Sequence, residues 1–267
     1  RITVQDLFLR YRQLAGMTGT MGHAAAELRK IYRVQVVDIP TNKPSQRKQW
    51  DDLVFGSASR KWEAIVDEIE AIHRSGRCVL IGTRSIDKSE KLSSMLRQRS
   101  IQHEVLNARQ LALEAMIVAA AGRPGQVTVA TNMAGRGTDI KVEAAALTVG
   151  GLHVICTELH ESSRIDRQLI GRCGRQGDVG SYRQFMSLED DILKVGLGEQ
   201  RAAELRRYAT CPPHQLARFA PLFRQAQRRI EKKHFESRKL LLYREKARGE
   251  IQREMGQDPY LDVAGAF

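Results

Sequence analysis

The sequence predicts an α/β protein in which a parallel sheet is wrapped by helices and followed by a long α-helical segment. Short apolar runs at 78–81, 127–131 and 152–157 have the composition of buried strands. Helical patterns of about 10 to 15 residues separate such runs, and this alternation is typical of parallel sheets. After Leu193 the pattern becomes basic and helical, without further strands.

The first 44 residues are expected to form a region separate from the sheet. Helical spacing of apolar residues predicts helices over 3–15 and 23–31, with Thr3 as N-cap of the first. Residues 34–39 have the composition of a strand. The polar stretch 41–52 reads as a linker, so we place a domain boundary there.

The alternation then runs in order from Leu53 to Ser187. The expected helices are 60–74, 85–97, 111–121 and 162–171. The expected strands are 78–81, 103–106, 127–131, 152–157 and 183–187. In the first helix the apolar residues predicted to face the core are Trp62, Ile65, Ile69 and Ile72. Function gathers in parallel sheets at the loops after the strands' carboxyl ends, here at Thr83, Asn132 and Thr157.

The last part of the chain is predicted to be a long helix over 216–255. Residues 195–267 hold 15 Lys and Arg against 9 Asp and Glu. This excess favours an exposed helix that docks along one apolar stripe.

Composition narrows the class of protein. A net charge of +12 over 267 residues, with a pI near 9.8, indicates an anionic partner: nucleic acid, acidic lipid or nucleotide phosphate. Four scattered cysteines do not make a disulfide framework or a zinc site, so a reducing compartment is expected. No apolar run approaches the ~20 residues that span a bilayer. The chain opens on Arg1 in mid-pattern, and we expect it to be part of a longer protein.

Two loops combine glycine with arginine. One covers residues 132–139 and the other residues 168–178. Glycines beside guanidinium groups bring backbone and positive charge close to a polyphosphate. The structural alternatives are an Arg136–Asp139 ion pair that shapes the first loop, and an Arg172–Arg175 pair stabilised at a helix C-terminus.

Several motifs together carry a family resemblance. They are GMTGT at 16–20, PTNKP at 40–44, ATNMAGRGTDI at 130–140, GGLHVI at 150–155, HESSRIDRQLIGRCGRQGD at 160–178 and SLEDDIL at 187–193. They resemble the SecA family, ATPases that drive preproteins through the bacterial translocon. The tail at 226–247 resembles the scaffold helix of that family. The resemblance covers nearly the whole chain.

The resemblance implies a two-lobed motor that binds ATP between two RecA-like domains. Residues 1–44 would be the C-terminal remnant of the first nucleotide-binding domain. Residues 45–194 would be the second RecA-like motor domain, of superfamily 2 helicase type, and residues 195–267 the helical scaffold segment. The chain would then supply the arginine side of a shared ATP site.

The resemblance also assigns site residues. The implied catalytic residues, which stabilise charge on the γ-phosphoryl group, are Arg172 and Arg175. The implied cofactor-binding residues are Gly135, Arg136, Gly137, Asp139, Gln168, Thr18, Gly19 and Thr20. No metal ligands are assigned, since His23, His153 and His160 have no partner at metal-ligand spacing.

The implied cofactor is ATP, with Mg²⁺ held mainly by an upstream domain. The sequence contains no GxxxxGK[ST] phosphate loop. The full-length protein is therefore expected to be an ATPase, and this chain alone inactive. Implied partners are unfolded preprotein, a SecYEG-type membrane channel and an acidic phospholipid surface, with a homodimer as one option and no nucleic acid. The implied location is cytoplasmic, peripheral to the inner face of the bacterial plasma membrane.

Departures from the family pattern leave alternatives open. Ile170 and Cys173 stand where the family has an arginine and a serine, which suggests a divergent paralogue. A second hypothesis is the C-terminal lobe of a superfamily 2 RNA or DNA helicase, which salt-sensitive binding to single-stranded RNA would distinguish. The chain shows no basic stretch interleaved with aromatics for base stacking. A third is a non-catalytic regulatory module.

Overall fold

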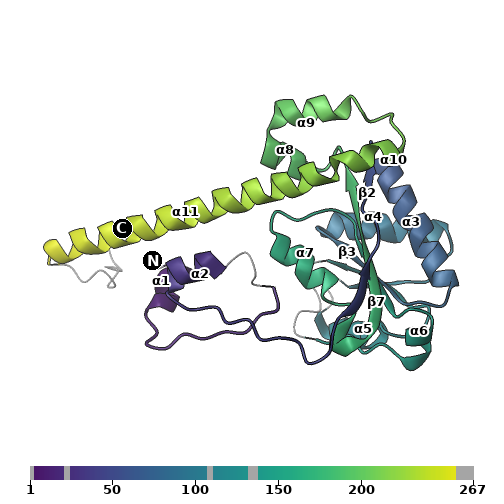
Figure 1. Cartoon of the computed structure of the whole chain (residues 1–267), viewed down its shortest axis with the longest axis horizontal. Coiled ribbons are helices and arrows are strands. Elements are labelled where there is room, and N and C mark those ends of the chain that lie inside the picture. The colour runs from purple at the N-terminus through teal and green to yellow at the C-terminus, as the bar shows by residue number, and fades with distance from the viewer. Residues whose placement is uncertain (1–2, 21–24, 107–110, 132–137, 257–267) are drawn as a thin grey trace. The chain divides into compact units, whose positions relative to one another are not determined.

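A computed structural model describes residues 3–20, 25–106, 111–131 and 138–256, with the backbone alone at 111–114 and 253. The chain divides into two compact units (Figure 1). We call Thr41–Ile230 the sheet unit. We call Arg1–Pro40 together with Glu231–Phe267 the helical unit.

The sheet unit is built on a parallel sheet, as predicted. In the described residues its seven strands are β1 (Gln46–Gln49), β2 (Leu53–Phe55), β3 (Val79–Thr83), β4 (Glu104–Leu106), β5 (Val127–Thr131), β6 (Leu152–Cys156) and β7 (Val179–Ser187). The hydrogen-bonded order is β1–β7–β6–β3–β5–β4, with β2 also on β7. Every pairing is parallel. The predicted fold class is confirmed.

The outer edge of β7 is covered by two short strands in succession. Gln46 of β1 lies opposite Val179, and Leu53 of β2 lies opposite Phe185. The prediction of a linker over 41–52 is therefore wrong at β1. All four side chains of β1 are exposed. An edge strand needs only backbone pairing, so a wholly polar sequence gives no apolar signal for it.

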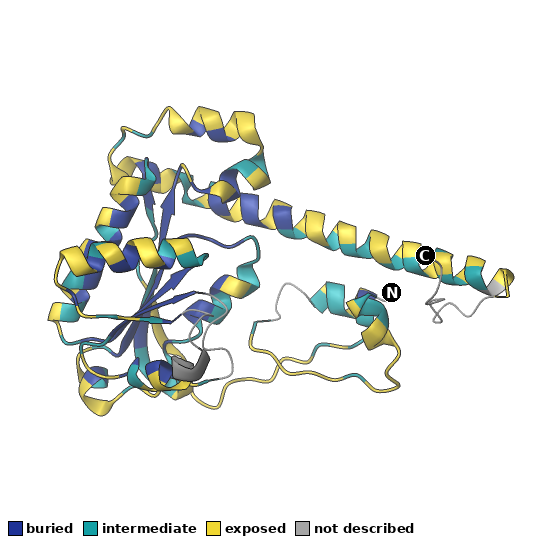
Figure 2. Ribbon diagram, turned by 180° about the vertical axis from the view of Figure 1, so that it is seen from behind, coloured by how far each residue is buried: buried dark blue, intermediate teal, exposed yellow. Residues whose placement is uncertain are grey.

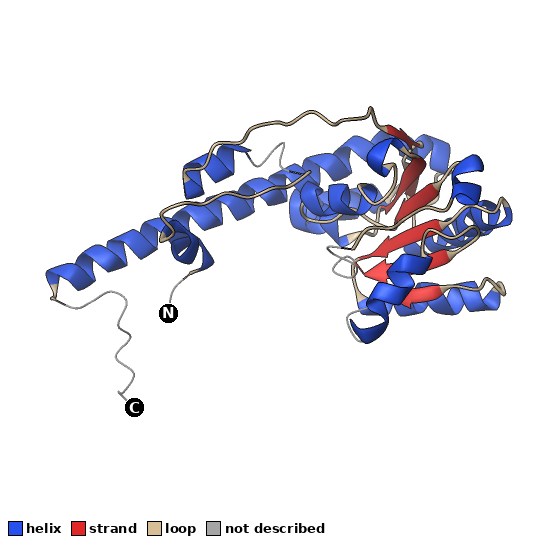
Figure 3. Cartoon of the chain, turned by 90° about the horizontal axis from the view of Figure 1, so that it is seen from below, coloured by secondary structure: helices blue, strands red, loops and turns tan. Residues whose placement is uncertain are grey.

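Helices cover both faces of this sheet, and the central strands β3, β5 and β6 are buried between them (Figures 2 and 3). On one face lie α3 (Ala58–Arg74) and α4 (Ile86–Gln98). The four residues predicted to form the inner face of the first helix are buried there with Val79 and Ile81. Ser57 and Ser85 cap the two helices through their hydroxyls.

The opposite face carries α5 (Leu111–Ala120), α6 (Ala144–Thr148) and α7 (Ser163–Ile170). Cys78 and Cys156 are buried in this layer, and burial raises the pKa of the Cys78 thiol to about 11. Both are therefore small core residues, as predicted. Helix α6 is a missed element, since its Ala-rich sequence lacks an apolar period.

A third apolar cluster closes one end of the sheet unit. It contains α8 (Asp191–Leu197), α9 (Glu199–Arg206), α10 (Pro213–Leu216), the turn η3 (Ala217–Phe219) and the start of α11 (Ala220–Glu254). Phe223 and Ile230 of α11 are buried here. Farther along, Leu241, Ile251 and Met255 are exposed, so the predicted apolar stripe holds only for the first turns. No described helix is long and apolar enough to cross a membrane.

The helical unit contains α1 (Val4–Leu9), α2 (Ala25–Tyr32) and most of α11. Thr3 caps α1 by accepting from the Asp6 amide, as predicted, but the helix ends six residues early. The strand predicted over 34–39 is wrong, because a strand needs a pairing partner and these residues pair with none of the described strands.

His153 of β6 is fully buried in a polar network at the centre of the sheet unit. Its Nδ1 lies 2.7 Å from the Ser181 hydroxyl and its Nε2 lies 2.9 Å from Glu68 Oε1. Arg77 donates to the same Ser181 oxygen, and the Trp50 ring lies 4.5 Å from the imidazole, centroid to centroid. Burial lowers the pKa of His153, because the effect of desolvation is larger than the opposing effect of Glu68.

We expect the buried imidazole to make stability depend on pH. Because the folded pKa is depressed, the unfolded chain takes up the proton first as pH falls from about 7 toward about 5. The free energy of unfolding should therefore fall more steeply in this range for the wild type than for His153→Gln. Urea titrations at several pH values measure this, with exposed His214→Gln as the control. Parallel pH profiles for wild type and His153→Gln would contradict it.

Candidate functional site at the carboxyl edge of the sheet

Three central strands end together at one edge of the sheet. Thr83 of β3 is in register with Thr131 of β5, and Gly82 is in register with Cys156 of β6. The segments that leave these strands therefore start side by side. The first arginine loop begins here, and its residues 132–137 lie outside the described residues, so the predicted Gly135, Arg136 and Gly137 are not placed.

Helix α7 delivers the second arginine loop to its position. Its Leu169 packs directly over Gly82, where an added Cβ would lie 2.1 Å from Leu169 Cδ2. A larger residue at position 82 would therefore require the Leu169 side chain to shift. The helix ends at Ile170, and Gly171 caps it by donating its amide to the Arg167 carbonyl.

The two predicted catalytic arginines turn toward the same short segment. Arg172 donates from Nη1 to the Thr138 carbonyl at 2.8 Å. Arg175 forms an ion pair with Asp139 and donates from Nε to the Gly171 carbonyl at 2.9 Å. Neither arginine lies in α7, since both follow it in the turn that contains η2 (Arg175–Gly177). The structure thus brings Arg172, Arg175 and Asp139 together.

The turn between the arginines depends on backbone that only glycine adopts easily. Gly174 has φ 63° and ψ 39°, in the left-handed region. An added Cβ would lie 2.7 Å from Cβ of Arg47 on β1. Arg47 also donates to the carbonyls of Ile170 and Cys173, each at 3.5 Å. The edge strand β1 therefore supports the arginine turn from behind.

The residues that depart from the family pattern face the core. Ile170 and Cys173 are buried with the apolar cluster beneath α7. Burial raises the pKa of the Cys173 thiol to about 11. The apolar side chain of Ile170 is therefore stabilised by packing in this cluster.

The other predicted site residues have less specific surroundings. Gln168 lies half-buried on α7, two residues before its end. Thr18, Gly19 and Thr20 belong to the helical unit, where the Thr20 amide donates to the Thr18 hydroxyl in a local turn. These local contacts do not show what Gln168, Thr18, Gly19 or Thr20 would bind.

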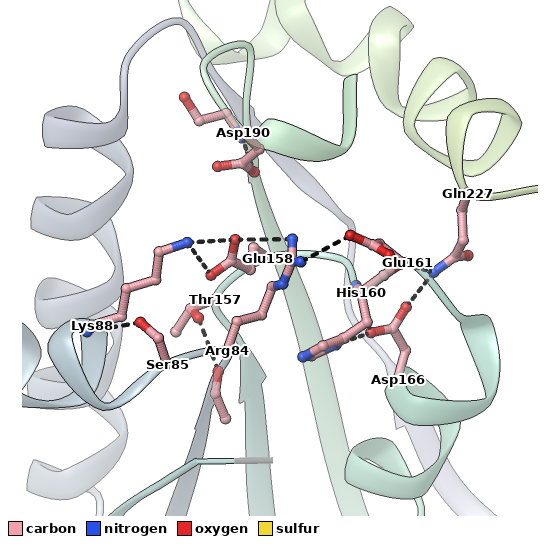
Figure 4. Close-up of polar contacts among 12 residues, drawn as sticks. Arg84, Ser85, Lys88, Thr157, Glu158, His160, Glu161, Asp166, Asp190 and Gln227 are labelled. Atoms are coloured by element: carbon pink, nitrogen blue, oxygen red, sulfur yellow. Dashed lines mark hydrogen bonds and ion pairs between the residues drawn. The ribbon is translucent and has the colours of Figure 1, made fainter. Parts of the chain in front are cut away.

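Sequence reasoning missed an ionic cluster at the same edge (Figure 4). Glu158 is buried and accepts two bonds from Lys88 Nζ, at 2.6 and 2.7 Å. Arg84 lies 3.7 Å from Glu158 and 3.6 Å from Glu161. The loop at Thr83 is predicted from the sequence. The acidic partners of Arg84 lie about 75 residues later, so no local sequence pattern indicates them.

A second missed cluster lies beside the first. Asp166 of α7 accepts from the His160 backbone and ring and from Gln227 of α11. All three residues are buried. Among the described residues there is no group of three side chains suited to hold a metal ion.

Arg172 and Arg175 make the edge suited to an anion. The Arg175 side chain is 38% exposed, and Asp139, its one carboxylate partner among the described residues, is 43% exposed. A planar guanidinium in this setting matches the oxygens of a phosphate. The donor set therefore fits an anion such as a phosphate group.

Comparison with known sequences identifies the family. The family model of the SecA P-loop domain matches residues 44–148 and 143–210. A relative from Rhodopirellula baltica, "Protein translocase subunit SecA 2", is 59% identical over 98% of this chain. "Protein translocase subunit SecA" from Desulfotalea psychrophila is 46% identical over 99%. The chain belongs to the SecA family.

The chain spans 40% of the first of these relatives and 31% of the second. Among solved structures, Escherichia coli SrmB, a DEAD-box protein bound to regulator of ribonuclease activity A, matches 60% of this chain and 86% of its own. Its TM-score is 0.44 at 20% identity. Domain 2 of the DEAD-box helicase Mss116p, bound to an RNA duplex, matches 82% of this chain and 89% of its own, with TM-score 0.43 at 16% identity.

Replacing Gly174 should disturb the arginine turn. We expect Gly174→Ala to lower the free energy of unfolding of the sheet unit by about 1 to 3 kcal/mol, because alanine is strained in the left-handed region and meets Arg47. Chemical denaturation measures the change. In the control Gly249→Ala, the glycine is helical, has open space around it and lies in the helical unit, so the free energy of unfolding of the sheet unit should not change. Equal effects at the two sites would refute the strain.

Proposed function

We propose that this chain supplies the arginine side of an ATP site in a SecA-type protein-translocation motor. The observation that carries the proposal is the convergence of Arg172 and Arg175 on residues 138–139, at the carboxyl edge of a parallel sheet. Ligands of open α/β sheets bind at this edge. Membership of the SecA family and the translocase names of the relatives support the motor assignment.

In this proposal Arg175 is the arginine finger. Its half-exposed guanidinium is held at the loop surface by Asp139 and by the Gly171 carbonyl. Asp139 thus keeps the charge oriented before nucleotide arrives, which lowers the cost of ordering a long side chain. Arg172 is anchored more firmly by the Thr138 carbonyl and helps to fix the loop. We assign it a direct contact with phosphate as well.

Bound ATP with Mg²⁺ supplies the γ-phosphoryl group whose charge grows in the transition state. The chain's contribution is to orient donors toward that charge. We propose that Gly135, Arg136, Gly137 and Gln168 contact the nucleotide beside Asp139. We further propose that Thr18, Gly19 and Thr20 sense the phosphate from the first domain.

The domain assignment follows the same proposal. Residues 1–44 would be the remnant of the first nucleotide-binding domain, 45–194 the second RecA-like domain and 195–267 the scaffold segment. Mg²⁺ would be held mainly by the first domain. The whole motor would act on unfolded preprotein at a SecYEG-type channel, on the cytoplasmic face of the membrane. The +12 charge supports contact with acidic phospholipid.

The finger role predicts a specific kinetic effect. In the full-length protein, Arg175→Ala should lower kcat for ATP hydrolysis on the order of 10³-fold, because charge stabilisation is lost in the transition state. Nucleotide affinity should change little. Steady-state turnover and equilibrium nucleotide binding measure both. Arg74→Ala, whose side chain is 75% exposed at the end of α3, is the control. An unchanged kcat would reduce Arg175 to a structural residue.

The shared site predicts that this chain is inactive by itself. Its sequence lacks the GxxxxGK[ST] loop that cradles phosphates, so the 267-residue chain should release no phosphate from Mg·ATP above background. A phosphate-release assay with the full-length protein as positive control tests this. Robust turnover by the chain alone contradicts a site divided between two domains.

A further inference from the structure

The segment that joins β6 to α7 runs from Thr157 to Ser162. Its first four residues, Thr157–His160, are buried. The Thr157 hydroxyl donates to the Gly82 carbonyl at 2.9 Å, and Glu158 binds Lys88. Leu159 packs into the apolar cluster that contains the start of α11. The connection therefore contacts the sheet, α4 and α11 at once (Figure 4).

Gln227 is the polar link from α11 to this connection. Its Nε2 donates to the His160 carbonyl at 2.7 Å and to Asp166 Oδ2 at 2.6 Å. The other carboxylate oxygen of Asp166 accepts from the His160 amide at 3.1 Å and lies 2.5 Å from His160 Nδ1. One amide group thus uses both of its hydrogens on two elements, the connection and the first turn of α7.

The burial of this group makes it costly to break. Gln227 is 5% exposed, His160 5% and Asp166 4%. A buried carboxylate that loses a donor cannot recover the bond from water. Polar groups of this kind fix one arrangement of their elements more strictly than apolar packing does. Helix α11 and helix α7 are therefore held in one register.

We propose that Gln227 is a positioning residue for the arginine loop. It holds the first turn of α7 to α11, and the last turn of α7 leads into Arg172 and Arg175 two and five residues after Ile170. A shift of α11 along its axis moves the α7 first turn and with it the arginine turn. Only the effect on turnover rests on the proposed function, because the mechanical link itself is independent of it.

The link is tested first without any nucleotide, in this chain. Gln227→Met keeps the side-chain volume and removes both donors. Hydrogen–deuterium exchange of residues 163–178 should accelerate about tenfold, while β3 and β5 stay unchanged. Gln225→Met, the same change two residues earlier at an exposed position, should have no effect. Exchange at 163–178 equal to the wild type overturns the proposal.

A general loss of folding is separated from the specific effect by a second variant. Gln227→Asn retains the amide but is one methylene too short to reach both acceptors. If Gln227→Met does not fold, Gln227→Asn should still show faster exchange confined to 163–178. Acceleration spread evenly over the sheet unit would mean a merely structural role and overturn the proposal.

The effect on turnover is then measured in the full-length protein. Gln227→Met should lower kcat about tenfold and leave KM for ATP unchanged, because donors move without being lost. Combined with Arg175→Ala, it should cause less than this tenfold loss, since only Arg172 is left for Gln227 to position. A full further tenfold loss in the double variant overturns the positioning role. If Arg175→Ala alone leaves turnover intact, and Gln227→Met still accelerates exchange at 163–178, then the arginine-finger role of Arg175 is wrong. The link from α11 to α7 then stands without it.

Discussion

Parallel pairing of β3 with β5 and β6 is the constraint on which the rest of this structure depends. It ends three strands at one edge, so that segments far apart in sequence leave the sheet together. The close approach of Leu169 to Gly82 then fixes α7 on that edge. The position of Arg172 and Arg175 follows from this placement, because the arginine turn begins where α7 ends.

The amount that could be predicted from sequence differs between parts of the chain. The buried strand Val127–Thr131 is predicted to the residue, and Val79–Thr83 and Leu152–Cys156 are predicted to within two residues, because burial on both faces leaves a strong signal. The polar strand β1 and the Ala-rich helix α6 have no comparable apolar signal in the sequence. The 34–39 stretch misled, since its β-branched residues have no strand to pair with among the described residues. Composition reports burial, whereas pairing depends on neighbours.

In the candidate site, too, some features can be predicted from the sequence and others cannot. The glycine–arginine motifs point directly to Arg172 and Arg175, and Asp139, the partner of Arg175, is also among the predicted residues. The contact from Arg47 that supports the turn cannot be predicted from a local pattern, because Arg47 lies more than 120 residues earlier in the sequence. Ile170, next to the turn, packs in the core.

The short strand β1 has a mechanical consequence. It is parallel to β7, joined to it by a register of four residue pairs, and its Arg47 bonds the carbonyls behind the arginine turn. A pull along the strand axis on the chain before Gln46 would load these bonds together in shear instead of breaking them one at a time. Through Arg47 the same pull would reach the backbone that carries Arg172 and Arg175.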